Sequence, residues 1–414
     1  WHLAAFFTVA IRQQMRIFSK ENSREPTKDE AEEIRARTLS TVRGTVQADQ
    51  LKESMGQNTL VLNLDTALKL MGDVAEFYVD NEVRNHYFVS ISGYHIAEAG
   101  ANPITQAALT LSNGLTYVEL FRARGLDANK FLRNFSWFFS NGMDPEYSVI
   151  GRVSRRIWSI AMREMYNVDE RGQKLKYHIQ SSGRSLHAQE YTWNDYRTTM
   201  QALYALADNA NSLHTNSRDE AFGTPTEDTV RDAVAIQLIL SREYGWLQNE
   251  NPLQGSFVAE WLTDHVEEEI LGIFEEMHRR GGVLGSLEVN YQRNRIQDES
   301  MMYEHKKHDG SLPIIGVNTF TDPDAEALNA DNADAFNMDV TRSDENEKRM
   351  VIERNRKFQQ DHTEEAEAGI ARLKQVAREG GNLFEAMMDV VEHCTVGQVT
   401  QALFETGGKF RRNM

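Results

Sequence analysis

Apolar residues follow two different spacings along the first 245 residues. Recurrence at every third or fourth position predicts helices over 1–20, 27–42, 64–80, 103–124, 145–167, 193–209 and 227–245. Thr27 stands before an acidic first turn and is the expected N-cap of the second helix. Short β-branched and aromatic runs between the helices predict strands at GTVQ (44–47), YFVSIS (87–92), NFSWFFS (134–140), YHIQSS (177–182) and NSLHTN (211–216). This alternation is typical of βα units and predicts a parallel sheet with crossover helices.

The pattern changes after residue 245, where charged amphipathic helices dominate. We expect helices over 258–280, 283–307, 346–378 and 382–406, and a short strand or extended segment at PIIGVN (313–318). These expectations divide the chain into a (β/α) barrel part (1–245), a helical extension (246–320), an acidic Asn- and Asp-rich loop (321–346) and a C-terminal helical region (347–414).

Several predicted strands end in polar side chains instead of a plain turn. They are Gln47, Tyr94-His95, Ser140-Asn141, Gln180–Ser182 and His214–Asn216. The carboxyl ends of strands form the active site in a (β/α)8 barrel of the TIM type, which is the fold class we predict. Only about five βα units are visible, so we expect an incomplete barrel whose N-terminal strands are missing. The chain also begins in mid-pattern without methionine, which suggests that it starts partway into a longer protein.

Composition excludes some classes of partner. A net charge of −17 argues against nucleic acid, and no apolar run approaches the roughly 20 residues of a membrane span. The single cysteine, Cys394, excludes an internal disulfide and fits the reducing cytoplasm. The sequence has no phosphate loop, dinucleotide fingerprint or CxxC pair. The pair His305 and His308 lies among lysines and is expected on a solvated face, so no metal site is predicted.

The polar strand ends contain neutral hydrogen-bonding groups and imidazoles instead of paired carboxylates. Hydrolysis would require an acid–base pair or an activated nucleophile. A rim of Gln, His, Tyr and Asn instead suits a neutral substrate that is held while a cofactor supplies the difficult chemistry. A histidine in a loop is by itself more often a structural residue, so the single pair Tyr94-His95 does not decide the question.

Four long motifs resemble the substrate-binding barrel of adenosylcobalamin-dependent acyl-CoA mutases. They are GTVQADQLKE (44–53), SISGYHIAEAGANP (90–103), HIQSSGRSLHAQE (178–190) and NSLHTNSRDEA (211–221). FFSNGMDPEY (138–147), NENPLQGSF (249–257), HKKHDGSLPIIGVNTF (305–320) and the terminal RRNM are similar to one branch, in which an isobutyryl-CoA mutase is fused to a G-protein chaperone. The resemblance implies a radical isomerase that interconverts isobutyryl-CoA and n-butyryl-CoA by migration of the thioester group.

The resemblance also implies roles for individual residues. His95 matches the histidine that hydrogen-bonds the migrating thioester carbonyl, and Tyr94 matches the tyrosine that shields the radical pair. Gln57 stands where the methylmalonyl branch has an arginine that pairs with a substrate carboxylate. An uncharged amide there suits a substrate with a methyl group, because an unpaired buried cation is costly. Gln57 does not distinguish isobutyryl-CoA from 2-hydroxyisobutyryl-CoA.

Further positions match ligand contacts of the family. The substrate and coenzyme A contacts are Arg43, Thr45, Gln47, Tyr87, Ser136, Arg171 and Lys176, and the positions beside the corrin or its adenosyl ligand are Gln180, Gly183, Glu220 and Gly223. In the fused branch, Glu288 and Asn413 match contacts to GTP, which binds with Mg in the attached G domain.

The chain departs from the family by lacking both the Asp-x-His-x-x-Gly motif that ligates cobalt and a phosphate loop for GTP. We therefore expect partner domains for cobalamin and GTP, on the same polypeptide or another chain, and an isolated chain that is inactive. The branch implies a homodimer. The alternatives are a 2-hydroxyisobutyryl-CoA or methylmalonyl-CoA mutase subunit, or a non-catalytic docking or dimerisation module that uses its terminal helices.

Overall fold

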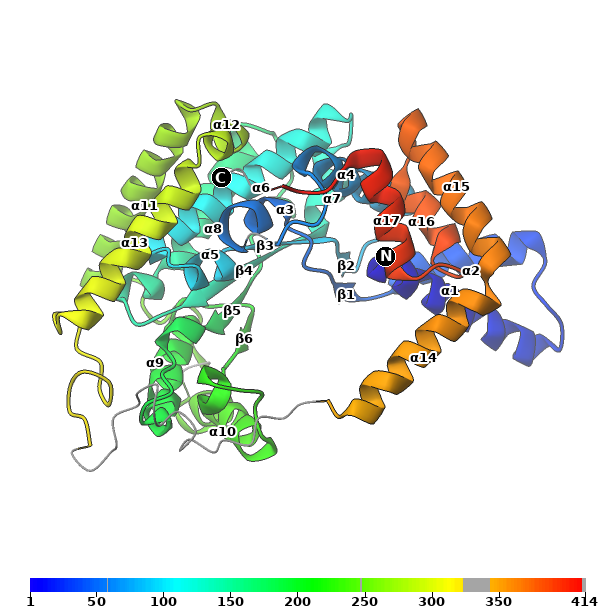
Figure 1. Cartoon of the computed structure of the whole chain (residues 1–414). Helices are drawn as coiled ribbons and strands as arrows, with labels where there is room; N and C mark the ends of the chain where they lie inside the picture. The colour runs from blue at the N-terminus through cyan, green and yellow to red at the C-terminus, as the bar shows by residue number, and fades with distance from the viewer. Residues whose placement is uncertain (58, 246–247, 323–342, 412–414) are drawn as a thin grey trace.

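Short parallel strands form the centre of the α/β part of the molecule (Figure 1). The computed structural model describes residues 1–414 except 58, 246–247, 323–342 and 412–414. The strands within it are β1 (Gly44–Thr45), β2 (His86–Tyr87), β3 (Val89–Ser92), β4 (Phe135–Asn141), β5 (Tyr177–Ser181) and β6 (Ser212–His214). β1 pairs with β2, and the other four pair in the order β3-β4-β5-β6, all in parallel. The predicted parallel sheet is therefore confirmed.

Helices surround the strands and build a second, wholly helical part. Their bounds are α1 (His2–Asn22), α2 (Lys28–Thr41), α3 (Gln50–Lys52), the π-helical η1 (Glu53–Gln57), α4 (Leu64–Asp80), α5 (Tyr94–Glu98), α6 (Pro103–Ala123), α7 (Ala128–Phe131), α8 (Ile150–Glu164), α9 (Asn194–Ala207), α10 (Glu227–Leu238), α11 (Phe257–His278), α12 (Gly282–Glu288), α13 (Tyr291–His308), α14 (Glu345–Asp361), α15 (Thr363–Glu379), α16 (Leu383–Val390) and α17 (Val396–Gly407). Thr27 caps α2 in a capping box with Glu30, as predicted.

Three helices predicted as continuous are broken in the structure. The helix expected over 283–307 divides into α12 and α13 at Asn290, whose φ of 56° is incompatible with a right-handed helix. The helix over 346–378 divides at His362, between α14 and α15. The helix over 382–406 divides before Thr395, which starts α17 with a new capping box. Apolar spacing continued across each break, so periodicity did not reveal them.

The segment 313–318, expected as a short strand or extended segment, instead contains a turn at 316–318. The side chain of Asn318 accepts from the Ile314 amide at 2.7 Å and donates to the carbonyls of Lys307 and Leu312. These bonds fold the segment into a turn, and only an isolated bridge joins Ile315 to Thr319. Most of the predicted acidic loop, residues 323–342, lies outside the described residues.

One face of the β3–β6 sheet is apolar and packs against helices. Trp137 of β4 lies edge-on to Trp158 of α8, with ring centroids 4.8 Å apart. A Cβ atom on Gly114 of α6 would come within 2.2 Å of the Trp137 ring, so glycine is required for this helix to approach the sheet. The sheet is thus held from its outer side.

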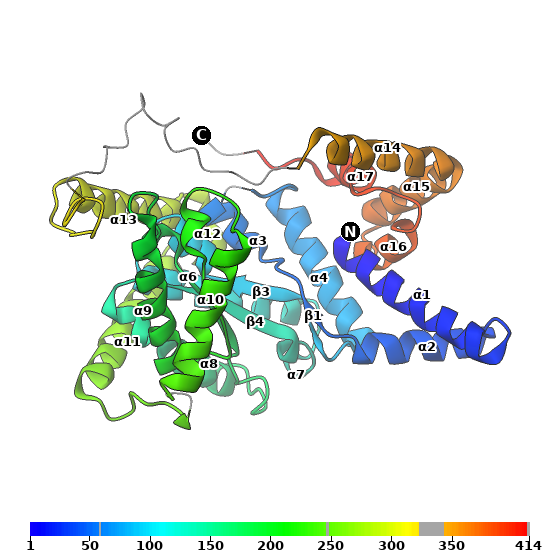
Figure 2. The same ribbon diagram turned by 90° about the horizontal axis from the view of Figure 1, so that it is seen from below.

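The helical part joins segments from both ends of the sequence (Figure 2). Phe384 of α16 lies edge-on to Phe77 of α4 at 4.9 Å and to Phe7 of α1 at 6.4 Å. The Trp1 indole donates to the Cys394 carbonyl at 2.9 Å. Helices α15–α17 therefore complete a core that α1 and α4 begin. Among the helices of the described chain, none is both long and apolar enough to cross a membrane.

Candidate functional site

The second face of the β3–β6 sheet is polar. Every second residue of a strand points to the same face of the sheet. Across β3, β4 and β5, the register places Ser92, Phe138 and His178 side by side on this face. Across β4, β5 and β6, it places Ser140, Gln180 and His214 side by side. His178 lies 2.8 Å from the Ser212 hydroxyl, and burial lowers the pKa of its imidazole to about 4. The sequence predicted polar strand ends, and the structure also places polar side chains further back on this face, at Ser136 and His178, with the apolar Phe138 beside His178.

Tyr94 and His95 begin α5 directly after β3, where the chain turns sharply. A Cβ atom at Gly93 would lie 2.4 Å from the Thr110 hydroxyl, so only glycine fits this turn. The Tyr94 ring stacks on Phe138 with centroids 4.9 Å apart, and the His95 ring stands edge-on to Phe138 at 6.0 Å. The turn thereby places a phenol and an imidazole side by side over the end of β4.

His95 is held from its Nδ1 side. Nδ1 lies 2.9 Å from the Lys52 ammonium of α3 and 2.8 Å from the Ser92 hydroxyl of β3. Burial, and then the positive charge of Lys52, lower the pKa of His95 to about 4. The imidazole is therefore neutral at physiological pH.

The helix that bears Lys52 is capped by a buried carboxylate. Asp49 is fully buried and caps α3 by accepting from the amides of Leu51 and Lys52. It also accepts from the Tyr117 hydroxyl at 2.8 Å and from the Ser92 amide at 3.1 Å. Burial raises the pKa of Asp49 and lowers that of Lys52. This carboxylate therefore fixes α3 and β3 relative to each other, and with them both partners of His95.

A second buried carboxylate, Glu98, joins α5 to the ends of β4 and β5. It accepts from the hydroxyls of Ser140 and Ser182 at 3.2 and 3.0 Å and from the amides of Gly183 and Arg184 at 3.1 and 2.9 Å. Burial is the main reason that its pKa is raised. The cluster fixes the loop after β5 against Tyr94.

The predicted cofactor contacts gather around Tyr94. A Cβ atom on Gly183 would lie 2.9 Å from Glu98 and 3.5 Å from the Tyr94 hydroxyl, so backbone approaches that hydroxyl closely. The Gln180 amide donates to Asn216 at 2.9 Å. Burial raises the pKa of Tyr94, and the charges of Glu98 and then Glu220 add to this shift. Gly223 lies nearby in sequence, where its amide donates to Asp219.

Gln57 lies at the end of η1 with an exposed side chain. The preceding residue, Gly56, lies against the backbone of His95 and Ile96, with its ideal Cβ position 3.5 Å from the His95 carbonyl oxygen. η1 is thus packed next to α5, and Gln57 comes from the element that neighbours His95. Thr45 ends β1 and Gln47 follows it; both are exposed, and Gln47 accepts from Lys52 at 3.3 Å.

The predicted coenzyme A contacts lie near the amino ends of strands. Ser136 is the second residue of β4, and Arg171 and Lys176 precede β5. Arg43 precedes β1, and Tyr87 of β2 is in register with Thr45. The side chains of Arg43, Arg171 and Lys176 are exposed. Ser136 lies two residues before Phe138, the ring that His95 contacts.

Of the two predicted GTP contacts, Glu288 is among the described residues. Glu288 is exposed at the end of α12. Asn413 lies outside the described residues.

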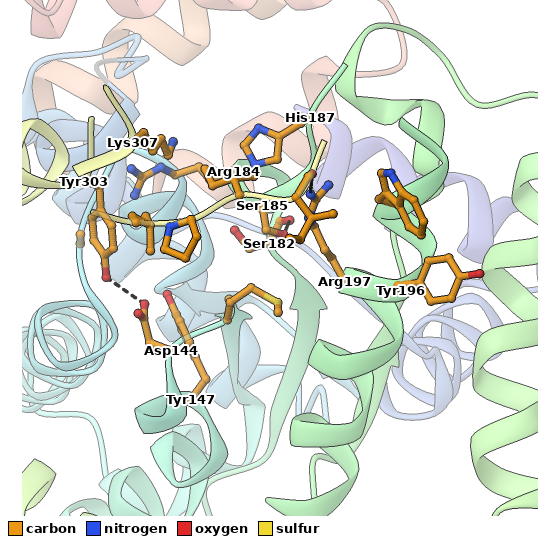
Figure 3. A pocket seen from close by; sticks show the side chains of 18 residues that line it. Asp144, Tyr147, Ser182, Arg184, Ser185, His187, Tyr196, Arg197, Tyr303 and Lys307 are labelled. Carbon is orange, nitrogen blue, oxygen red and sulfur yellow. Dashed lines mark hydrogen bonds between the residues drawn. The ribbon is translucent and has the colours of Figure 1, made fainter. Parts of the chain in front are cut away.

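A cavity of about 490 Å³ opens beside the polar rim (Figure 3). Loops after β4 and β5 line it together with α9 and α13, and the Tyr303 hydroxyl donates to Asp144 across it at 2.8 Å. Ser182 and Arg184 connect its wall to Glu98. Within the part of the chain that the structure describes, no group of three or more His, Cys, Asp or Glu is placed to hold a metal ion.

Sequence reasoning missed Lys52, Asp49 and Glu98. Lys52 and Asp49 fall inside the first motif, and Glu98 falls inside the second. Each looks like an ordinary charge on a short helix. Their burial results from contacts between elements distant in sequence, which a pattern of apolar positions does not reveal.

Comparison with known proteins gives a consistent result. A family described as methylmalonyl-CoA mutase matches residues 30–409. The whole chain is 58% identical over 412 residues to a fused isobutyryl-CoA mutase of Nocardia farcinica, of which it spans 38%. It is 32% identical to the 2-hydroxyisobutanoyl-CoA mutase large subunit of Aquincola tertiaricarbonis, over 92% of this chain and 66% of that subunit. It is also 32% identical to the methylmalonyl-CoA mutase of Rhizobium meliloti, over 89% of this chain and 51% of that enzyme.

Proposed function

Since the chain belongs to the methylmalonyl-CoA mutase family, we propose that it forms the substrate-binding part of an isomerase that interconverts isobutyryl-CoA and n-butyryl-CoA. The observation that carries the proposal is a neutral, firmly held imidazole at position 95, next to the element that bears the uncharged Gln57. The whole-chain identity to fused isobutyryl-CoA mutases supports it. The chain spans 38% of the length of the Nocardia protein, so the activity is proposed for the polypeptide that contains it.

In this proposal His95 donates a hydrogen bond to the thioester carbonyl oxygen of the substrate. A pre-aimed donor stabilises negative charge that develops on this oxygen as the group migrates. The low pKa of His95 keeps it neutral, so the group polarises the carbonyl and does not protonate it. Tyr94 covers the reacting carbon atoms, and its raised pKa keeps the phenol un-ionised.

The residues around Tyr94 fit one face of adenosylcobalamin. Gly183 has no side chain, so its backbone can approach Glu98 and Tyr94 closely, and the buried Asn216 holds the neutral amide of Gln180. When bound, the cofactor would supply the organic radical that takes a hydrogen atom from the substrate. Gln180, Gly183, Glu220 and Gly223 would hold the cofactor. The residue that ligates cobalt is proposed to come from another domain.

Coenzyme A would lie along the polar inner face of the sheet. Arg43, Arg171 and Lys176 at the amino ends of strands would bind its phosphates by charge-assisted hydrogen bonds. β4 has seven residues, so its inner face spans about 20 Å, which suits an extended pantetheine arm that ends at His95. Thr45, Gln47, Tyr87 and Ser136 would contact this arm.

Gln57 would select the acyl group. An uncharged amide can face a methyl substituent without the desolvation cost that an unpaired guanidinium would incur. We further propose that the full polypeptide acts as a cytoplasmic homodimer with cobalamin and G-protein domains, and that Glu288 and Asn413 face the bound GTP and Mg.

The proposal is tested with the full-length polypeptide that contains these residues. The purified protein is incubated with adenosylcobalamin and, separately, isobutyryl-CoA, 2-hydroxyisobutyryl-CoA and methylmalonyl-CoA, and the products are separated by chromatography. We expect n-butyryl-CoA from the first substrate at a kcat/KM at least tenfold above the other two. Preference for either of the other substrates would contradict the assignment.

A further inference from the structure

The Lys52 side chain is buried next to the His95 ring. Only 2% of it is exposed, and its ammonium lies 2.9 Å from Nδ1 of His95. It also donates to Gln47 at 3.3 Å and lies 3.6 Å from the Glu53 carboxylate. A buried lysine is rare without partners, so its placement here requires a reason.

The chemistry of the two groups determines which of them donates. An ammonium group has three donors and no acceptor. Nδ1 of His95 must therefore accept, which leaves the proton of the neutral imidazole on Nε2. The Ser92 hydroxyl at 2.8 Å can either donate or accept, so by itself it would permit both tautomers. Lys52 is the partner that removes this ambiguity.

We propose that Lys52 is a positioning residue that fixes His95 in the tautomer protonated on Nε2, so that Nε2–H points away from Lys52 and meets the substrate carbonyl. The inference rests on the proposed function, in which His95 donates to the thioester. Within the described residues, the hydrogen bonds of the His95 ring fall on Nδ1. The other ring nitrogen is then the donor that the reaction uses.

The groups around Lys52 shift its pKa and fix its position. Burial lowers the pKa of its ammonium, and the negative charges of Asp49 and Glu53 act in the opposite direction. Asp49 also caps α3 and binds the Ser92 amide, so it places Lys52 and Ser92 on the same side of the ring. The two donors and the imidazole thus form one rigid unit.

The tautomer is tested directly by neutron crystallography of the wild-type holoenzyme after hydrogen–deuterium exchange. We expect nuclear density for deuterium on Nε2 of His95 and none on Nδ1. Deuterium on Nδ1 would overturn the inference. This measurement does not depend on turnover, so it decides the tautomer even if the proposed substrate is wrong.

Kinetics of the full-length enzyme test the consequence. In Lys52→Met the ring can also take the tautomer protonated on Nδ1, and we expect kcat to fall about two- to tenfold with KM changed by less than about threefold, because equal populations halve the donor form and a preference for the tautomer that donates to Ser92 reduces it further. Lys52→Arg keeps a cationic donor and should recover most of kcat. Lys69→Met, which removes a lysine bonded to Asp73, is the matched control and should retain wild-type kcat.

The outcomes separate the two hypotheses. A folded Lys52→Met enzyme with wild-type kcat would overturn the positioning role. A wild-type enzyme that isomerises no acyl-CoA would contradict the proposed function alone. If Lys52→Met does not fold, the neutron structure and the Lys52→Arg variant still decide the question.

Discussion

Gln57 is the residue on which the proposed choice of acyl group depends. We expect Gln57→Arg in the full-length enzyme to lower kcat/KM for isobutyryl-CoA at least tenfold, because the guanidinium would face a methyl group without a counter-charge. Gln57→Asn keeps a neutral amide and serves as the control. The test compares initial rates for both variants. Equal values for Gln57→Arg and wild type would remove Gln57 from the specificity argument.

His86 illustrates how a buried imidazole makes stability depend on pH. It is 3% exposed, its Nδ1 lies 2.8 Å from the Tyr78 hydroxyl, and burial lowers its pKa to about 4. The folded pKa is below the unfolded value of about 6.5, so stability is complete above pH 6.5 and is lost as the pH falls toward 4.

Replacement of His86 by glutamine removes this dependence. At pH 8 we expect His86→Gln to be about 1 kcal/mol less stable than wild type, because the bond to Tyr78 is weakened. Between pH 6.5 and 5 the difference should shrink by up to about 1.4 kcal/mol per pH unit and then change sign, since only the wild type loses stability there. Urea unfolding at pH 6.5 and at pH 5 measures the difference in the free energy of unfolding between the two proteins. A difference that stays constant over this range would contradict the expectation.

At the residue scale, the sequence motifs identified the groups that are proposed to contact ligands. They did not identify the buried groups that hold those side chains in place. Tyr94 and His95 were identifiable because they stand together at a strand end. Lys52 and Glu98 were not, because each becomes important only when α3, α5 and the loop after β5 come together in space. The roles proposed for the ligand-contacting residues remain predictions.

Among the elements, the turn between β3 and α5 is the most constrained. Gly93 has φ of −80°, which any residue can adopt, so space and not backbone conformation requires glycine. We expect Gly93→Ala to lower the free energy of unfolding by about 1–3 kcal/mol, because the new methyl group would overlap Thr110 and Gln106.

A second substitution separates crowding from other causes. Thr110→Ala removes the hydroxyl that lies 2.4 Å from the ideal Cβ position, so the double variant should recover part of the loss. Both variants are measured by urea unfolding against Thr110→Ala alone. Strictly additive effects would show that the overlap is not the cause.

Element types were more predictable from the sequence than element ends. Helices such as α4 and α6 combine strong apolar spacing with an asparagine N-cap, and their predicted ranges agree closely with the structure. The breaks at Asn290 and His362 were missed because the apolar pattern continues across them. Tertiary contacts decide such ends, and local spacing does not record them.

At the scale of the whole molecule, Asp73 connects three helices. From α4 it binds Arg124 after α6 at 3.0 Å, Lys69 at 2.6 Å and the Leu383 amide of α16 at 2.8 Å. Its side chain is 2% exposed. It therefore links the α/β part to the C-terminal helices.

We expect Asp73→Asn to lower the free energy of unfolding by about 3 kcal/mol, because two cations lose their buried counter-charge. Glu76→Gln is the matched control, since Glu76 also pairs with Arg124 but is more exposed, and it should cost less than about 1 kcal/mol. Urea unfolding gives the free energy of unfolding of both variants. Limited proteolysis shows whether α15–α17 detach from the rest of the molecule. Equal effects of the two substitutions would contradict a special role for Asp73.

An α/β fold with a parallel sheet could be predicted from alternating patterns, but the arrangement of the terminal helices could not. Phe7 and Phe384 meet although 377 positions separate them in the sequence (384 minus 7). The spacing of apolar residues along the sequence does not indicate such a contact. The order of strands β3 to β6 was easier, because consecutive βα units usually place neighbouring strands side by side.

The β3–β6 sheet has one apolar face and one largely polar face, and this difference affects how the protein can evolve. Its cohesion comes from aromatic and aliphatic side chains on the helix-facing side, such as Trp137 and Ile179. Ser136, His178 and Gln180 on the opposite side contribute little to that cohesion, so exchanging them removes few packing contacts. The packed face can therefore stay unchanged while residues on the polar face are exchanged, and relatives that share the family are named for different substrates.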